Sequence, residues 1–179
     1  MRRRVLVLIA ILAAAGCARE EAPRPVPPEP IARPAPPRPV GRAVSNADYV
    51  AIASSTDLFE IRSAEVALTR TANPVLQRFA REMLRDHEGT AAQLSLAGRR
   101  LNLLPSSRLR PEHEAMMREL LATADFDRLY WRQQVTVHEQ AFNLHRNYAA
   151  HGASPTLRPV AAAAVPIVRR HLDALRGMR

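Results

Sequence analysis

From Ser45 onward, apolar residues recur at alternating steps of three and four, and no stretch alternates steadily between polar and apolar positions. This spacing gathers apolar side chains on one face of a helix, whereas a half-buried strand needs a period of two. Aromatic residues make up only 4% of the chain, so the core must consist mainly of Ala, Leu, Val and Ile. The spacing therefore predicts an all-α domain over residues 45–179.

Capping residues mark the expected helix ends. Ser45 to Asp48 has the shape of a capping box, Asn73 precedes Pro74, and Gly152 follows a long helical stretch. These signals predict four long helices, over about 46–71, 74–101, 126–151 and 155–176, and a short one over 111–122. Because the first and last connections are short, neighbouring helices should run antiparallel. We expect an antiparallel four-helix bundle with a short extra helix in the middle connection.

The N-terminal residues 1–17 have the pattern of a bacterial lipoprotein signal. A basic start precedes an apolar run over 5–15, which is shorter than the roughly 20 residues of a membrane-spanning helix. The run leads into Ala14-Ala-Gly-Cys17, which resembles a lipobox, and Cys17 is the single cysteine of the chain. We expect Cys17 to carry a lipid, the alternative being a plain cleaved signal. Ala18, in place of an Asp that would favour the inner membrane, predicts an outer-membrane lipoprotein facing the periplasm.

Residues 18–44 are predicted to be a disordered tether. Nine of the 15 prolines fall between Pro23 and Pro39, interleaved with charged residues. Proline lacks the amide hydrogen that helices and sheets require, so such a stretch favours an extended polyproline II spacer. The alternative is a proline-rich ligand for a protein partner. On either reading, the folded domain begins near Ser45.

Composition excludes several classes of function. All 26 basic residues are Arg, and the domain from Ser45 onward carries 18 Arg against 14 acidic residues, a net charge of +4. No basic patch is interleaved with aromatic residues, so anionic lipid is a better partner than nucleic acid. A single cysteine excludes a disulfide scaffold, a zinc finger and a CxxC redox site. There is no nucleophile elbow or P-loop, and the chain is more typical of a binding protein than of an enzyme.

Each long helix places one residue that can bind a metal on its apolar stripe. These residues are Glu65, His87, His138 and His171. Glu60 is expected to lie nearer than Glu65 to the height of His87 along the bundle axis, but it lies on a more polar stripe of its helix. Because bundle cores commonly hold metals on facing helices, we expect the four side chains to bind a divalent ion, Zn, Cu or Fe.

The alternative is that each of these histidines is a hydrogen-bonded core residue. The domain would then be a non-catalytic structural or protein-interaction module with a partner protein in the envelope. The remaining histidines, His113, His145 and His151, lie near expected helix ends and are predicted to be solvated.

Several segments resemble one known family. In order they are Ser63–Leu68, Phe79–His87, Phe126–Tyr130, His138-Glu139 and Val165–Leu172. Together they resemble the bacterial domain of unknown function 4142. The resemblance implies a ferritin-like helical bundle in a secreted or envelope protein, and no established reaction.

Two departures from the family's pattern bear on the type of metal centre that the domain could form. Val137 stands where the family has an Asp before its second His, and the positions three before His87 and His138 are Leu84 and Val135. Ferritin-like di-iron centres need a Glu at that spacing, so a di-iron oxidase is not expected.

Overall fold

The structure, a computed structural model, describes residues 44–178 of the chain. Over these residues it contains five helices and no strand: α1 (Asn46–Arg70), α2 (Pro74–Arg100), α3 (Pro111–Ala122), α4 (Phe126–His151) and α5 (Leu157–Gly177). The prediction of an all-α domain is confirmed. The expected signal over 1–17, with Cys17, and all but the last residue of the expected tether lie outside the described residues.

α1 and α2 begin where the side chain of the N-cap residue satisfies a free amide. Ser45 Oγ accepts a hydrogen bond from the Asp48 amide at 3.1 Å, and Asn73 Oδ1 accepts one from the Val75 amide at 2.9 Å. The predicted starts of α1 and α2 are therefore confirmed. The last helix begins at Leu157, later than expected, because Ser154 Oγ accepts from the Leu157 amide and residues 155–156 form a turn.

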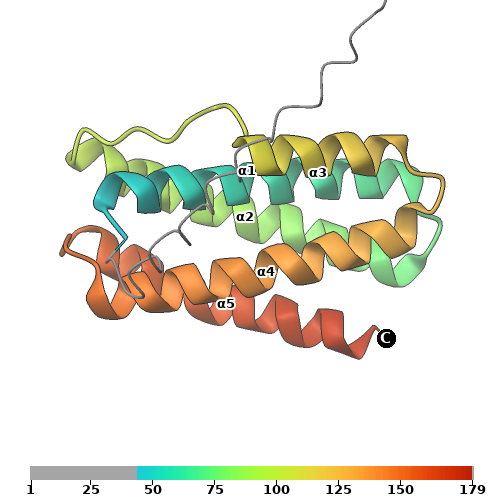
Figure 1. The fold of residues 1–179 in the computed structure, drawn as a ribbon. Coiled ribbons are helices and arrows are strands. Elements are labelled where there is room, and N and C mark those ends of the chain that lie inside the picture. Colours follow the sequence, from blue (N-terminus) through green and yellow to red (C-terminus); the bar gives the residue numbers. More distant parts are fainter. Residues whose placement is uncertain (1–43, 179) are drawn as a thin grey trace, which may run out of the picture. The chain divides into compact units, whose positions relative to one another are not determined.

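The four long helices pack as two pairs. α1 lies along α2 and α4 lies along α5, and the pairs meet through contacts of α1 with α4 and of α2 with α5. The short helix α3 packs against α1 and α4 (Figure 1). In the part of the chain that the structure describes, no helix is both long enough and apolar enough to cross a bilayer.

Two apolar clusters lie apart along the helices. One contains Phe79, Met83, Tyr130 and Leu175, and the other contains Tyr49, Leu94, Tyr148 and Leu157. The stretches of α1, α2, α4 and α5 between them contain the smaller apolar cluster of Phe59, Leu109 and Val137 in part, and they also carry buried polar residues: Ser54, Ser55, Thr56, Asp57, Glu60, Ser63, His87, Thr90, Gln133, Gln134, His138, His145 and His171. Buried polar groups need partners, and in this polar layer most of the partners come from a neighbouring helix.

Candidate metal centre

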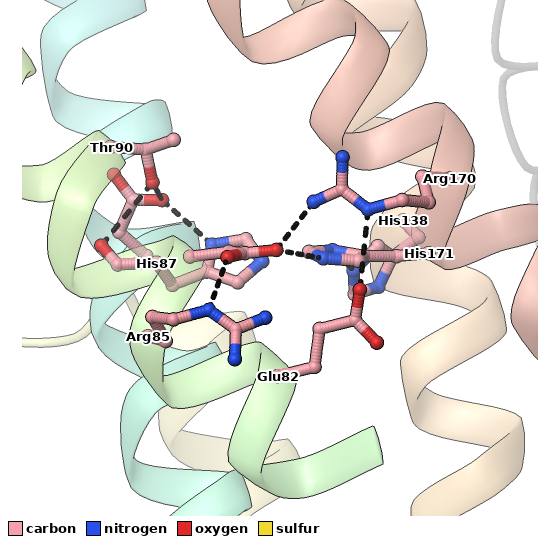
Figure 2. A network of polar contacts seen from close by, with 9 residues as sticks. Glu82, Arg85, His87, Thr90, His138, Arg170 and His171 are labelled. Atoms are coloured by element: carbon pink, nitrogen blue, oxygen red, sulfur yellow. Dashed lines mark hydrogen bonds and ion pairs between the residues drawn. The ribbon is translucent and has the colours of Figure 1, made fainter. Parts of the chain in front are cut away.

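Three histidines from three helices meet in the polar layer (Figure 2). His87 on α2, His138 on α4 and His171 on α5 are 2%, 1% and 0% exposed. Their ring centroids are 5.3 to 5.7 Å apart. One ring nitrogen from each lies within 4.8 Å of the others. The structure thus brings together three of the four residues predicted to bind a metal, and their role as ligands stays a prediction.

Glu65, the fourth predicted ligand, is exposed on α1, so the expectation that it points inward is wrong. The inward face of α1 instead carries Asp57 and Glu60, which are 6% and 0% exposed. The apolar residues Leu58, Ile61 and Leu68, which suggested the other face, are only half-buried. The buried face of α1 mixes apolar with polar residues in equal number, so apolar spacing did not identify it.

His87 is held by an acid on the neighbouring helix. Its Nδ1 donates to Asp57 Oδ1 at 2.9 Å, and the Thr90 hydroxyl donates to the same oxygen at 2.8 Å. Burial alone would lower the pKa of His87, but the hydrogen bond and negative charge of Asp57 outweigh it and raise that pKa. The other ring nitrogen, Nε2, is buried and has no hydrogen-bond partner among the described residues.

His138 has a defined tautomer when neutral. Its Nδ1 lies 2.8 Å from the backbone carbonyl of Gln134, which can only accept, so Nδ1 carries the hydrogen. Burial lowers the pKa of His138 well below its usual value, and the nearby His87 and His171 lower it further. The ring is therefore neutral at pH 7, with a lone pair on Nε2.

The lone pair of His138 faces His171, with 3.2 Å between Nε2 of His138 and Nδ1 of His171. On its other side, His171 Nε2 lies 3.0 Å from Asp86 Oδ2. Burial lowers the pKa of His171 to about 4, against the opposing influence of Asp86, so this ring is also neutral at pH 7. A neutral ring has one N–H, yet both of its nitrogens face acceptors. Neither neutral tautomer of His171 satisfies both contacts.

A bound cation would remove this conflict. If His171 donates from Nε2 to Asp86 and the incoming ion displaces the proton that the raised pKa of His87 keeps on its Nε2, three lone pairs face one another: Nε2 of His87, Nε2 of His138 and Nδ1 of His171. Ligand atoms of a tetrahedral ion with metal–nitrogen bonds of about 2.0–2.1 Å lie about 3.3 Å apart, close to the observed 3.2 Å between His138 and His171. An oxygen acceptor behind each ring is the usual support of a metal-binding imidazole. The donor set fits a transition metal.

Glu60 adds a buried acid beside this group. Its Oε1 lies 3.4 Å from Nδ1 of His138. Burial raises the pKa of Glu60 to about 8, although the charge of His87 and contact with Gln134 oppose the rise. At pH 7 the carboxyl is therefore largely protonated.

Two other histidines are buried, contrary to expectation. His113 is 4% exposed, with its Nδ1 2.7 Å from Ser55 Oγ, and His145 is 7% exposed, with its Nδ1 3.0 Å from the Tyr49 hydroxyl. Both partner hydroxyls lie on α1, and they satisfy rings that would otherwise need water. Only His151 is exposed, as predicted.

Comparison with known proteins agrees with the helical fold. Residues 32–178 match the sequence profile of the family described as Domain of unknown function (DUF4142). The chain belongs to this family. The resemblance inferred from its motifs is thereby confirmed, and no curated protein matches the sequence.

Two similar solved structures are described as CopM in the Cu(II)-bound form and CopM in the Cu(I)-bound form. The first has 18% identity and a TM-score of 0.64, over 75% of this chain and 95% of that one. The second has 17% identity and a TM-score of 0.64, over 75% of this chain and 94% of that one. At this level of identity the likeness shows a shared fold.

Proposed function

We propose that this member of the DUF4142 family is a metal-binding protein whose helices form a ferritin-like four-helix bundle, with His87, His138 and His171 as the ligands. The observation that carries the proposal is the 3.2 Å approach of Nε2 of His138 to Nδ1 of His171, because both rings are neutral at pH 7 and their other nitrogens face acceptors. The unpartnered Nε2 of His87 supplies a third donor. An ion bound by these three atoms would satisfy all of them.

The chemistry of the donors narrows the metal. Neutral imidazoles favour Zn, Cu and Fe over Mg and Ca, which prefer oxygen. The similar solved structures are copper-bound forms of CopM, so copper is the first ion to test. The role proposed is binding rather than catalysis, since the sequence carries no nucleophile motif.

We also propose that the domain is attached to the outer membrane and faces the periplasm. The support is the lipobox-like Ala14-Ala-Gly-Cys17 and the proline-rich stretch that separates Cys17 from α1. A lipid on Cys17 would hold the metal-binding domain in the cell envelope.

The metal proposal is tested by thermal unfolding of tag-free protein, stripped with chelator and titrated with Cu²⁺, Zn²⁺ or Fe²⁺. A ligand that binds only the folded state adds about 2.7 kcal/mol of stability at a hundredfold excess over Kd. For a domain of this size that corresponds to roughly 10 °C in Tm. His138→Gln keeps the size of the side chain and removes the best-placed lone pair, so its Tm should not respond to metal.

His151→Gln is the matched control, because it removes an exposed histidine from the same helix and should keep the full rise in Tm. If no ion raises the Tm of the wild type, or if His138→Gln responds equally, the histidines are core residues. The domain is then better described as a structural or protein-interaction module.

A further inference from the structure

A second group of charged side chains lies at the outer side of His171 (Figure 2). Asp86 Oδ2 is 3.0 Å from His171 Nε2, and the Arg170 guanidinium is 2.6 Å from the same oxygen. The other carboxylate oxygen, Asp86 Oδ1, lies 3.2 Å from Nε of Arg85. Arg170 Nε also lies 3.2 Å from Glu82 Oε1. The side chains of Glu82 and Arg170 are 33% and 53% exposed, so this group reaches solvent.

His171 belongs to both groups. Its Nδ1 faces His138 in the interior, whereas its Nε2 faces Asp86 and, beyond it, Glu82. One ligand atom from each of Glu82, Asp86 and His171 lies within 4.8 Å of the others. A single imidazole therefore separates the buried histidines from a pair of carboxylates at the surface.

The other acids near the histidines offer no comparable route. Asp57 is bound by His87 and Thr90, which are both buried, and Glu60 is fully buried. On another side Phe79 covers the group, with its ring centroid 6.4 Å from that of His138 and 6.1 Å from that of His171. Asp86 is the acid whose own partners extend to solvent.

We infer that Glu82, Asp86 and His171 Nε2 form an outer site for a divalent cation, through which the metal reaches the three histidines. In the metal-free protein the Arg170 guanidinium binds the two carboxylates of this site, and the arriving metal displaces it. The inference rests on the proposed function, because the three histidines are the destination of the ion. The buried and unpartnered Nε2 of His87 is separate support for that destination.

Electrostatics gives Arg170 this role. Two carboxylates at the surface attract a cation, and the guanidiniums of Arg170 and Arg85 cancel that field. Removing the charge of Arg170, which pairs with both acids, restores a net negative charge at the site. Arg170 can leave its partners at modest cost, because its own side chain is 53% exposed and water and salt compete for the guanidinium. A divalent ion carries twice the charge of the guanidinium. It can also bind His171 Nε2 when the hydrogen of that ring is on Nδ1, where Nε2 of His138 accepts it, whereas Arg170 cannot bind that nitrogen. Displacement of Arg170 by the metal is therefore favourable.

The test compares rates of metal binding by stopped-flow fluorescence of Trp131 with Cu²⁺, using the full-length protein. Arg170→Gln should speed association roughly 3- to 10-fold at low ionic strength, and the gain should largely vanish in 1 M salt, where the Debye length is about 3 Å. Arg170→Lys should restore the wild-type rate. Arg176→Gln is the matched control, because it removes the same charge from α5, and Arg176 pairs with Asp173 rather than with the acids of the outer site.

Glu82→Gln should slow both association and dissociation, leaving the affinity of the buried group within about twofold, because Glu82 contacts none of the three inner nitrogens. Unchanged rates in Arg170→Gln and Glu82→Gln, with normal binding by the wild type, would overturn the inference and leave the proposed function intact.

The outer site can also be tested without the inner one. In the double variant His138→Gln/Arg170→Gln, isothermal titration with Zn²⁺ should show one weak site that the further change Glu82→Gln removes. If the double variant binds Zn²⁺ in this way but the wild type binds no metal at the three histidines, the result supports the outer site and refutes the proposed function. The absence of any binding by the double variant would refute the outer site.

Discussion

Asp57 and His87 bind each other across the α1–α2 interface, with 2.9 Å between Oδ1 and Nδ1, and neither side chain is more than 8% exposed. The acid fixes which nitrogen of His87 is left for a ligand. It also supplies negative charge to a place where a divalent cation would otherwise be costly to bury. The first prediction concerns this acid.

Asp57→Asn should weaken metal binding by about 10- to 100-fold, the usual effect of removing the support behind a ligand histidine. The pKa of His87 should fall, because the charge of Asp57 and its hydrogen bond are what raise it. Metal titration and NMR of the imidazole measure the two effects. Glu65→Gln removes one negative charge from an exposed position on the same helix and should change neither quantity. Equal losses in the two variants would show that only net charge matters.

Glu60 should make stability fall as pH rises. Burial raises its pKa in the folded protein to about 8, whereas an unfolded Glu titrates near 4.3. Between these values the folded state binds more protons than the unfolded state, so the free energy of unfolding decreases with rising pH. Glu60→Gln lacks this loss. In chelator-treated protein, its advantage over the wild type should grow between pH 5 and pH 8, by about 3 kcal/mol in urea unfolding. A difference independent of pH would mean that Glu60 is already ionised at pH 5.

Ser55 joins α1 to the start of α3. Its Oγ accepts from the Arg110 amide at 2.8 Å and lies 2.7 Å from Nδ1 of buried His113. Ser55→Ala leaves both groups without a partner and should cost about 1–3 kcal/mol. Hydrogen exchange should quicken at the Arg110 amide and along α3. Ser106→Ala, at an exposed position in the same connection, should have little effect on α3. Unchanged hydrogen exchange at the Arg110 amide would show that the contacts of Ser55 are not needed to hold the start of α3.

Cys17→Ala should abolish labelling by a fatty-acid probe and move the protein from the membrane fraction to the soluble fraction. The physical reason is that the acyl chains supply the membrane affinity, each buried methylene contributing about 0.8 kcal/mol. Ala18→Asp keeps the acylated Cys and should shift the protein toward the inner membrane. Continued labelling of Cys17→Ala would refute lipidation at this residue.

The helix bounds could be predicted because capping is local: the Asp48 and Val75 amides are satisfied by side chains two or three residues away. His87, His138 and His171 were found because apolar neighbours at helical spacing surround each of them. Of the inward acids, Asp57 was missed and Glu60 was set aside in favour of Glu65, because α1 packs through both acids while its apolar Leu58 is only half-buried. Their burial depends on partners distant in sequence, which spacing along one helix does not reveal.

The burial of His145 illustrates the same limit. Its partner is the hydroxyl of Tyr49, 96 residues earlier in the chain. A histidine near a helix end is ordinarily solvated, and no local pattern distinguishes one that a distant tyrosine will cover.

The pairing of the helices has a consequence for any ion held at the three histidines. His87 and its support Asp57 belong to the α1–α2 pair, whereas His138 and His171 belong to the α4–α5 pair. Separation of the two pairs would leave each histidine with its own helix but dissolve the set of three. A metal bound there would link the α1–α2 hairpin to the α4–α5 hairpin. Release of the ion and separation of the two hairpins would then be coupled.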